Sequence, residues 1–348
     1  MTDAALFHAL LCVSALFGLH DMILQRKHMI ESIRLINNRL PGYGATSDAT
    51  ICAILFMAKA EYFQGNHGAW GVHMDGVKRI VELRGGTVTL SDLIQQKIYS
   101  TDLLGCIEIG ALPRFPIIDL PKLSSPPYLD NLPPAVVSLA KNYTLDAEFM
   151  GLLSEIATHI TSSPATDDTP SLQYRLLSLC NTRPYQHSHG DCLILTKTFR
   201  NHAQQAKSEI IQELLLISTL LFLSLPHLCA VPPIRPVNYT YLLSRLDSSA
   251  GLILVDHDTL LQQPEFLLWL LFLGDVLFST PVSLSAGTWE RSPFRGPMIA
   301  VSAILNITSW DEMKVAMGMM WAIDPKYEKP YRRLWEDAVV GHAICYEK

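Results

Sequence analysis

The spacing of apolar residues within residues 60–86 constrains the fold of this chain more than any other feature of its sequence. The side chains that recur every three or four residues are Trp70, His73, Met74, Val77, Ile80, Val81 and Arg84. Such spacing sets side chains along one face of a helix, so we expect this face to be buried. Gly85 and Gly86 follow the last periodic position, and the helix is expected to end there because glycine readily adopts a positive φ.

The other face of this predicted helix carries charged residues. Asp75 stands one helical turn before Arg79, and Lys78 stands one turn before Glu82. Oppositely charged residues at this spacing pair on a helix surface. We therefore expect a solvated flank stabilised by these two pairs.

The helical period continues along the rest of the chain. We expect two helices within residues 4–40 and further helices near 51–62, 93–107, 135–161, 172–180, 192–225, 239–247, 259–280, 297–307, 310–322 and 330–340. No alternating pattern is long enough to predict a strand. Prolines interrupt the helices, with seven between Pro113 and Pro134 and another group from Pro226 to Pro236. The sequence thus predicts an irregular all-α globule, a single domain over residues 1–348 that contains a proline-rich strap at 113–134.

Helix-capping residues stand where several of these helices should begin. Thr46 or Ser47 can cap the helix near 51–62, and Ser91 or Asp92 can cap the helix near 93–107. The string Asp256-His257-Asp258 could orient an imidazole for acid–base chemistry. It lies just before a predicted helix, however, and capping is its expected role.

Length, composition and charge bound the classes of protein to consider. The 348 residues are 49% hydrophobic and 17% charged, enough to bury one large core or two moderate ones. The formal net charge is −6, from 27 basic and 33 acidic residues. A broad phosphate-binding surface needs clustered Lys and Arg, so the chain is not expected to bind a DNA groove by itself.

The seven cysteines are spread along the chain. They stand at positions 12, 52, 106, 180, 192, 229 and 345, with no two closer than twelve residues. This spacing matches neither a disulfide framework nor a C-x2-C metal knuckle. We expect reduced and mostly buried thiols.

Three apolar runs raise the alternative of a secreted or membrane-associated protein. Residues 6–19 resemble a signal-peptide core but lack preceding basic residues and a small-x-small cleavage site. Residues 214–225 and 266–278 are shorter than the roughly twenty residues that a spanning helix needs. Helices that are apolar all round also occupy the centres of large helical domains, so we expect core helices rather than membrane spans.

No catalytic residue is nominated. The string from His187 to Cys192 resembles a metal-hydrolase signature, but it lies beside a proline turn and a helical pattern rather than in a strand-rich fold. The sequence contains no nucleophile elbow, phosphate-binding glycine loop or H-E-x-x-H motif. The six tryptophans could line a ligand pocket, although burial in the core is their commoner role.

Several strings in a fixed order resemble the regulatory domain (middle homology domain) of fungal-specific zinc-cluster transcription factors. The helix reads W-x2-H-x2-G, is entered from an E-x3-G-N turn that includes Asn66, and closes on R-G-G. Further strings are residues 99–102, 110–116, 174–179, 267–274, 309–314, 320–321 and 334–336. The signature residues are Glu61, Gly65, Trp70, His73, Gly76, Arg84, Gly85, Gly86, Asp102, Trp269, Trp310, Trp321 and Trp335.

This resemblance implies a nuclear regulator of transcription, with the cytoplasm as the alternative location. In the family, a separate N-terminal module of six cysteines holds two zinc ions and binds DNA. No such cysteine pattern occurs in this sequence, so we expect no zinc and no direct DNA binding from this polypeptide. The expected partners are other transcription regulators or a DNA-binding protein, together with a small effector. The alternative is a small-molecule binder or enzyme of secondary metabolism that keeps the fold without binding DNA.

Overall fold

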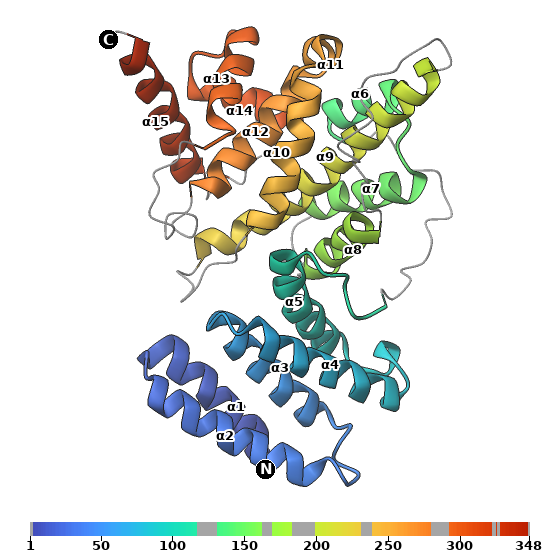
Figure 1. Ribbon diagram of the computed structural model, residues 1–348, viewed down its shortest axis with the longest axis vertical. Helices are drawn as coiled ribbons and strands as arrows, with labels where there is room; N and C mark the ends of the chain where they lie inside the picture. Colours follow the sequence, from blue (N-terminus) through green and yellow to red (C-terminus); the bar gives the residue numbers. More distant parts are fainter. Residues whose placement is uncertain are drawn as a thin grey trace. The chain divides into compact units, whose positions relative to one another are not determined.

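The computed structural model describes residues 3–116, 131–161, 169–182, 199–230, 239–279, 292–321, 325 and 328–346. These residues form helices joined by turns and short irregular segments, with no strand among them (Figure 1). The all-α prediction is confirmed. The chain divides into two compact units, and each is described by itself. That the whole chain is a single domain stays a prediction.

Unit 1 comprises residues 1–120, 167–181 and 230–238. Its helices are α1 (Ala4–Ser14), α2 (Met22–Arg39), α3 (Asp48–Phe63), α4 (His67–Arg84), α5 (Asp92–Ile109) and α8 (Thr169–Thr182). Figure 1 shows α1 and α2 as a helical hairpin beside α3. The third helix also packs on α4 and α5, so it forms the middle of the unit.

Capping side chains fix where the helices of unit 1 begin. Asp3 accepts a hydrogen bond from the Leu6 amide at 3.0 Å, and Asp21 caps α2 in the same way. The Ser47 hydroxyl accepts from the Thr50 amide at 3.3 Å, which confirms one of the two caps predicted for α3. Each cap satisfies an amide that has no partner within its helix.

The signature turn E-x3-G-N ends α3. The Asn66 amide donates to the Glu61 carbonyl at 2.9 Å, and the Asn66 side chain donates to the Glu61 carboxylate at 2.7 Å. Gly65 has a φ of +81°, a conformation that glycine adopts at little cost. The spacing of these three residues therefore specifies the backbone that leads into α4.

Substituting Gly65 tests this explanation of the turn. Gly65→Ala should lower the free energy of unfolding by roughly 1–2 kcal/mol, since an L side chain is strained at positive φ. Gly68→Ala, in the first turn of α4 with nothing within 4 Å of an added Cβ, should be neutral or slightly stabilising. Urea denaturation of both variants checks the prediction, and equal losses would contradict it.

The predicted end of α4 is also confirmed. Gly85 has a φ of +107° and follows Arg84, the last helical residue. The Gly86 amide donates back to the Val81 carbonyl at 2.9 Å. The glycine pair thus satisfies a carbonyl that the end of the helix would otherwise leave open.

Unit 2 comprises residues 121–166, 182–229 and 239–348. Its helices are α6 (Pro134–Asn142), α7 (Ala147–Thr161), α9 (Phe199–Ala230), α10 (Thr240–Leu254), α11 (His257–Gln262), α12 (Pro264–Phe278), α13 (Arg295–Ile304), α14 (Trp310–Gly318) and α15 (Glu328–Tyr346). The residues of α12 from Phe266 to Leu277 are all buried. This helix packs against α10, α13 and α14, so it is the central helix of the unit (Figure 1).

Two predicted helices of unit 2 are divided in the structure. The stretch 135–161 forms α6 and α7, because the Asp146 side chain accepts from the Glu148 and Phe149 amides and starts a new helix. The stretch 259–280 forms α11 and α12, since Pro264 occupies the first turn of α12, where its missing amide costs nothing.

Helix α9 extends past the predicted start of the second proline-rich turn. Helix α9 continues through Pro226 to Ala230, whereas the sequence predicted an end at 225. One proline removes a single intrahelical hydrogen bond, and the long apolar helix continues past it. The central part of the strap, 117–130, and the string from His187 to Cys192 lie outside the described residues.

Within the described ranges, no helix combines the length and the apolar character that crossing a membrane would require. Among the cysteines described with their side chains, Cys12, Cys106 and Cys180 are buried and Cys52 is partly buried. The expectation of reduced thiols stays a prediction.

Candidate functional site

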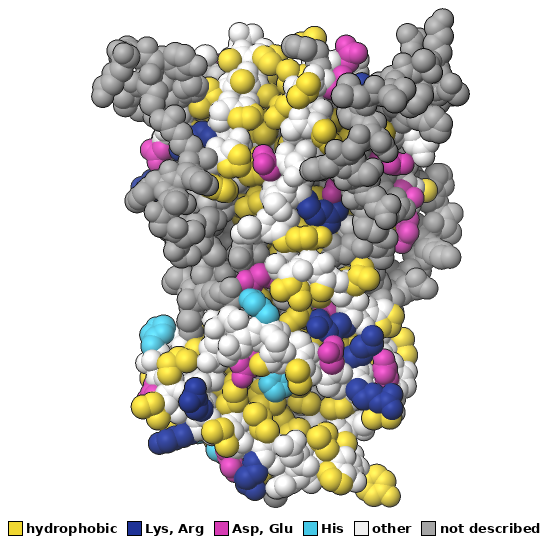
Figure 2. Space-filling view, viewed as in Figure 1, with side chains coloured by type: hydrophobic (Ala, Val, Ile, Leu, Met, Phe, Trp, Pro, Cys, Tyr) yellow, Lys and Arg dark blue, Asp and Glu magenta, His cyan; other side chains and the backbone are white. Residues whose placement is uncertain are grey.

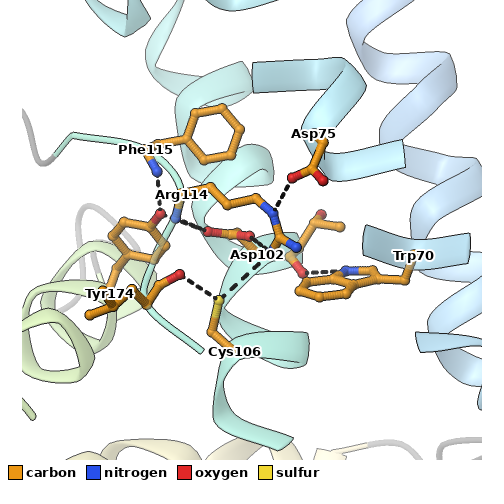
Figure 3. Close-up of polar contacts among 9 residues, drawn as sticks. Trp70, Asp75, Asp102, Cys106, Arg114, Phe115 and Tyr174 are labelled. Atoms are coloured by element: carbon orange, nitrogen blue, oxygen red, sulfur yellow. Dashed lines mark hydrogen bonds and ion pairs between the residues drawn. The ribbon is translucent and has the colours of Figure 1, made fainter. Parts of the chain in front are cut away.

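Two of the signature residues, Trp70 and Asp102, lie in a buried polar cluster of unit 1 (Figure 3). The Asp102 cluster, as we call it, consists of Trp70, Asp75, Asp102, Cys106, Arg114, Phe115 and Tyr174. Trp70 and Asp75 come from α4, Asp102 and Cys106 from α5, and Tyr174 from α8. Arg114 and Phe115 belong to the segment that follows α5. The cluster thus joins four segments of the chain.

The Asp102 carboxylate is the centre of the cluster. Its side chain is 0% exposed. One oxygen accepts from the Arg114 backbone amide at 2.8 Å and from the Tyr174 hydroxyl at 2.7 Å. The other accepts from Arg114 Nη1 at 3.0 Å. A buried charge is costly unless it is paired and hydrogen-bonded, and these three donors meet that requirement.

The Arg114 guanidinium links α4 to α5. Its Nε donates to Asp75 Oδ1 at 2.8 Å, and its Cζ lies 4.5 Å from the centroid of the Trp70 ring. Burial alone would lower the pKa of Arg114, but the Asp75 hydrogen bond and the charge of Asp102 raise it. The flank predicted for α4 is therefore rearranged, because Asp75 contacts Arg114 while Arg79 pairs with Glu82 at 3.5 Å.

Trp70 lies directly against the backbone of α5. Its indole N–H donates to the Thr101 carbonyl at 3.2 Å. The ring occupies the space above Gly105, where an added Cβ would lie 2.2 Å from it. Glycine is required here for close packing, a role that sequence analysis missed. A lone glycine within a helical pattern was the available signal.

Tyr174 attaches α8 to the cluster. Its hydroxyl accepts from the Phe115 amide at 2.9 Å while donating to Asp102. Its ring lies against Tyr99, with 4.8 Å between centroids. Burial, and after it the charge of Asp102, raises the pKa of Tyr174, so the hydroxyl keeps its proton. Arg114 and Tyr174 stood within the strings that resemble the family, but their meeting at Asp102 was not predicted.

The chemistry of the cluster is that of a structural centre. Burial, with the charge of Asp102 as the next cause, raises the pKa of the Cys106 thiol, which makes it a poor nucleophile. The Asp102 oxygens are engaged by donors from the protein itself. Within the described residues, no three His, Cys, Asp or Glu side chains are grouped to hold a metal ion. We therefore interpret the cluster as a joint that holds helices together.

The remaining signature residues of α4 lie outside the cluster. The predicted apolar face is buried at Trp70, Met74, Val77, Ile80 and Val81. His73 and Arg84 are only partly buried, which corrects the prediction for these two positions.

Each of these two side chains has a polar environment at the edge of the helix. Burial lowers the pKa of His73, while the charge of Glu61 raises it. Arg84 donates to the Thr46 carbonyl at 3.2 Å and pairs with Asp48. Gly76 faces open space, with nothing within 4 Å of an added Cβ. Position 76 therefore has no packing reason to be glycine.

The signature tryptophans of unit 2 are buried. They are Trp269, Trp310, Trp321 and Trp335. The Trp310 and Trp335 rings lie 6.2 Å apart, and the Trp310 indole donates to Glu328 at 3.1 Å. Ser309 and Glu312 form a reciprocal capping box at the start of α14, which explains the string at 309–314.

Removing the Ser309 hydroxyl should weaken the start of α14. Ser309→Ala is expected to cost about 0.5–2 kcal/mol of unfolding free energy, because the Glu312 amide loses its acceptor. Ser309→Asp should retain most of the stability, since Asp also caps. Chemical denaturation distinguishes the two, and an unchanged midpoint for the alanine variant would contradict the assignment.

Charges of both signs are interspersed on the face shown in Figure 2. Over the part of this face where α1–α5 lie, Lys and Arg side chains alternate with acidic and hydrophobic ones. Among the described residues on this face, basic side chains form no continuous stripe of the kind that follows a phosphate backbone.

Comparison with known proteins bears on the first part of the chain. Residues 1–158 match the family model of the fungal-specific transcription factor domain. Searches of curated proteins and of solved structures returned no match. The matched region includes α1 to α6, most of α7 and the signature residues from Glu61 to Asp102. The resemblance to fungal transcription factors is therefore confirmed over residues 1–158, and a domain of this kind indicates a role in regulating transcription.

Proposed function

We propose that this chain is a nuclear regulator of fungal transcription whose helical domain sets the activity of a zinc-cluster DNA-binding module through contacts with other proteins. The match of residues 1–158 to the fungal-specific transcription factor domain carries the proposal. The Asp102 cluster supports it, because residues from the strings that resemble the family, Asp102, Arg114 and Tyr174, meet there in one folded centre.

The chemistry of the chain favours regulation by contact over direct DNA binding. Its net charge is −6, and the face in Figure 2 mixes both signs of charge. A protein surface of mixed polarity suits other proteins better than a polyanion. We assign DNA recognition to a zinc-cluster module or to a DNA-binding partner, and we expect zinc only there.

A reporter assay in a fungal host tests the proposal. The full chain is fused to a bacterial repressor's DNA-binding module, and a reporter carries the matching operator. The fusion should change reporter expression several-fold relative to the module alone, and a fluorescent tag on the chain should collect in the nucleus. An inert fusion at matched protein levels would contradict the proposed function.

The Asp102→Ala fusion provides a matched control for the reporter assay. This substitution removes the centre of the cluster and leaves the exposed residues of unit 1 in place. Its fusion should lose the effect on the reporter, whereas Asp75→Ala, at an exposed partner of the same arginine, should retain it. Immunoblots must show equal amounts of the fusions.

A second candidate function is that of a small-molecule-binding protein or enzyme of secondary metabolism. Buried donor groups without partners among the aromatic residues of unit 2 favour this candidate. Ligand binding combined with an inert reporter fusion would support it over transcription regulation.

A further inference from the structure

Besides the Trp335 indole N–H, three buried hydrogen-bond donors of unit 2 have no partner among the described residues. They are the Thr219 hydroxyl and the indole N–H groups of Trp269 and Trp321. The residues are 0%, 0% and 3% exposed, respectively. No acceptor within the described part of the chain lies in hydrogen-bonding range of these atoms. An unpaired buried donor is destabilising, so each needs a physical explanation.

The two tryptophans that carry these donors lie beside one aromatic ring, that of Phe222. Its centroid lies 6.0 Å from that of Trp269 and 6.4 Å from that of Trp321, with the latter pair stacked. Thr219 precedes Phe222 by three residues on α9, so the two side chains share a face of the helix. Phe222 is partly exposed, although both tryptophans are buried. We call these four residues the Phe222 site.

Several comparable donors elsewhere in the chain are paired, although the buried Trp335 indole N–H is not. The Trp70 indole donates to the Thr101 carbonyl, and the Trp310 indole donates to Glu328. Next to Thr219 on α9, the buried Ser218 hydroxyl donates to the Leu214 carbonyl at 2.6 Å. The fold can therefore satisfy buried indole and hydroxyl groups where an acceptor lies within reach. No described residue satisfies the donors at the Phe222 site, and these donors suit an acceptor that a ligand supplies.

We propose that the Phe222 site binds a small aromatic molecule that carries an acceptor oxygen, such as an aromatic carbonyl compound. The two tryptophans and Phe222 supply ring faces for an aromatic group. Indole nitrogens donate and do not accept, so the ligand must provide the acceptor. This inference specifies the effector of the proposed function and in that respect rests on it.

Acetophenone and ethylbenzene provide a matched pair of probes. They have similar size and the same ring, but only acetophenone has a carbonyl oxygen. The full chain is labelled with 15N at its tryptophan indoles, and each resonance is assigned by a single Trp→Phe substitution. Acetophenone should shift the Trp269 and Trp321 indole signals and leave those of Trp70 and Trp310 in place. Ethylbenzene should bind more weakly and cause smaller shifts.

Two neighbouring substitutions on α9 separate a ligand site from ordinary core packing. Thr219→Val replaces the unpaired hydroxyl with a methyl group of similar shape. It should raise the melting temperature of the free protein by roughly 2–4 °C and weaken acetophenone binding about five-fold. Ser218→Ala removes a hydroxyl that is already paired, so it should leave acetophenone affinity unchanged and should not raise the melting temperature.

The inference is overturned if acetophenone leaves all indole signals unchanged or shifts them equally with ethylbenzene. It is also overturned if Thr219→Val destabilises the protein and leaves binding intact, since the donors would then be satisfied by buried water alone. Binding is measured on the isolated chain, so its outcome is independent of the reporter assay. If the reporter fusion is inert and acetophenone still binds specifically, the proposed regulatory function is rejected and the proposed ligand site is retained.

Discussion

Replacing Asp102 with alanine should lower the free energy of unfolding by about 3–5 kcal/mol, the loss expected when one partner of a buried ion pair is removed. The substitution leaves the Arg114 amide, the Arg114 Nη1 and the Tyr174 hydroxyl without their shared acceptor. Two of these donors lie on the segment after α5 and the third lies on α8. Urea denaturation followed by circular dichroism measures the effect.

Asp75→Ala is the matched control for Asp102→Ala. Asp75 contacts the same guanidinium, but its side chain is 70% exposed, whereas that of Asp102 is 0% exposed. Exposed ion pairs contribute about 1 kcal/mol or less because water competes for both charges. Equal losses of unfolding free energy for the two variants would contradict this account, because burial would then not determine how much each ion pair stabilises the fold.

Gly105→Ala should also destabilise unit 1 strongly. The added Cβ would lie 2.2 Å from the buried Trp70 ring, which is far closer than atoms can approach. Either the ring moves and loses its hydrogen bond to the Thr101 carbonyl, or α4 and α5 separate. Overpacking of this kind typically costs about 1–3 kcal/mol. A fall in the thermal midpoint with altered tryptophan fluorescence is the expected result.

Gly76→Ala tests whether the effect at Gly105 comes from the close contact rather than from loss of a glycine. Position 76 lies within α4 and has nothing within 4 Å of an added Cβ. Alanine favours the helix over glycine by roughly 0.5–1 kcal/mol, so Gly76→Ala should be stabilising. A destabilised Gly76→Ala would instead mean that the signature glycine faces a neighbour absent from unit 1.

The fold was largely predictable because helical periodicity and capping residues are local signals. Ser47 and the Gly85-Gly86 pair lie at a helix start and a helix end, as predicted. The breaks at residues 143–146 and at Gln263 were missed, because the apolar period runs across both. In each case a single local event, the Asp146 cap or Pro264, outweighs periodicity.

The candidate site was only partly predictable. Resemblance to the family singled out Trp70 and Asp102. It did not predict which contacts either side chain makes. Tyr174 is separated from Asp102 by 72 residues, so their hydrogen bond depends on tertiary structure. Gly105 becomes necessary only once the Trp70 ring is placed above it. The spacing of residues along the sequence gives no signal for these tertiary contacts.

The central claim is that Asp102 and Tyr174 together join α8 to the rest of unit 1, and a double-mutant cycle tests it most directly. The free energy of unfolding is measured for the unmodified chain, Asp102→Asn, Tyr174→Phe and the double variant. A hydrogen bond to a buried charge predicts a coupling energy of about 1.5–3 kcal/mol. Losses that add to within roughly 0.5 kcal/mol would contradict the claim, because independent sites behave in that way.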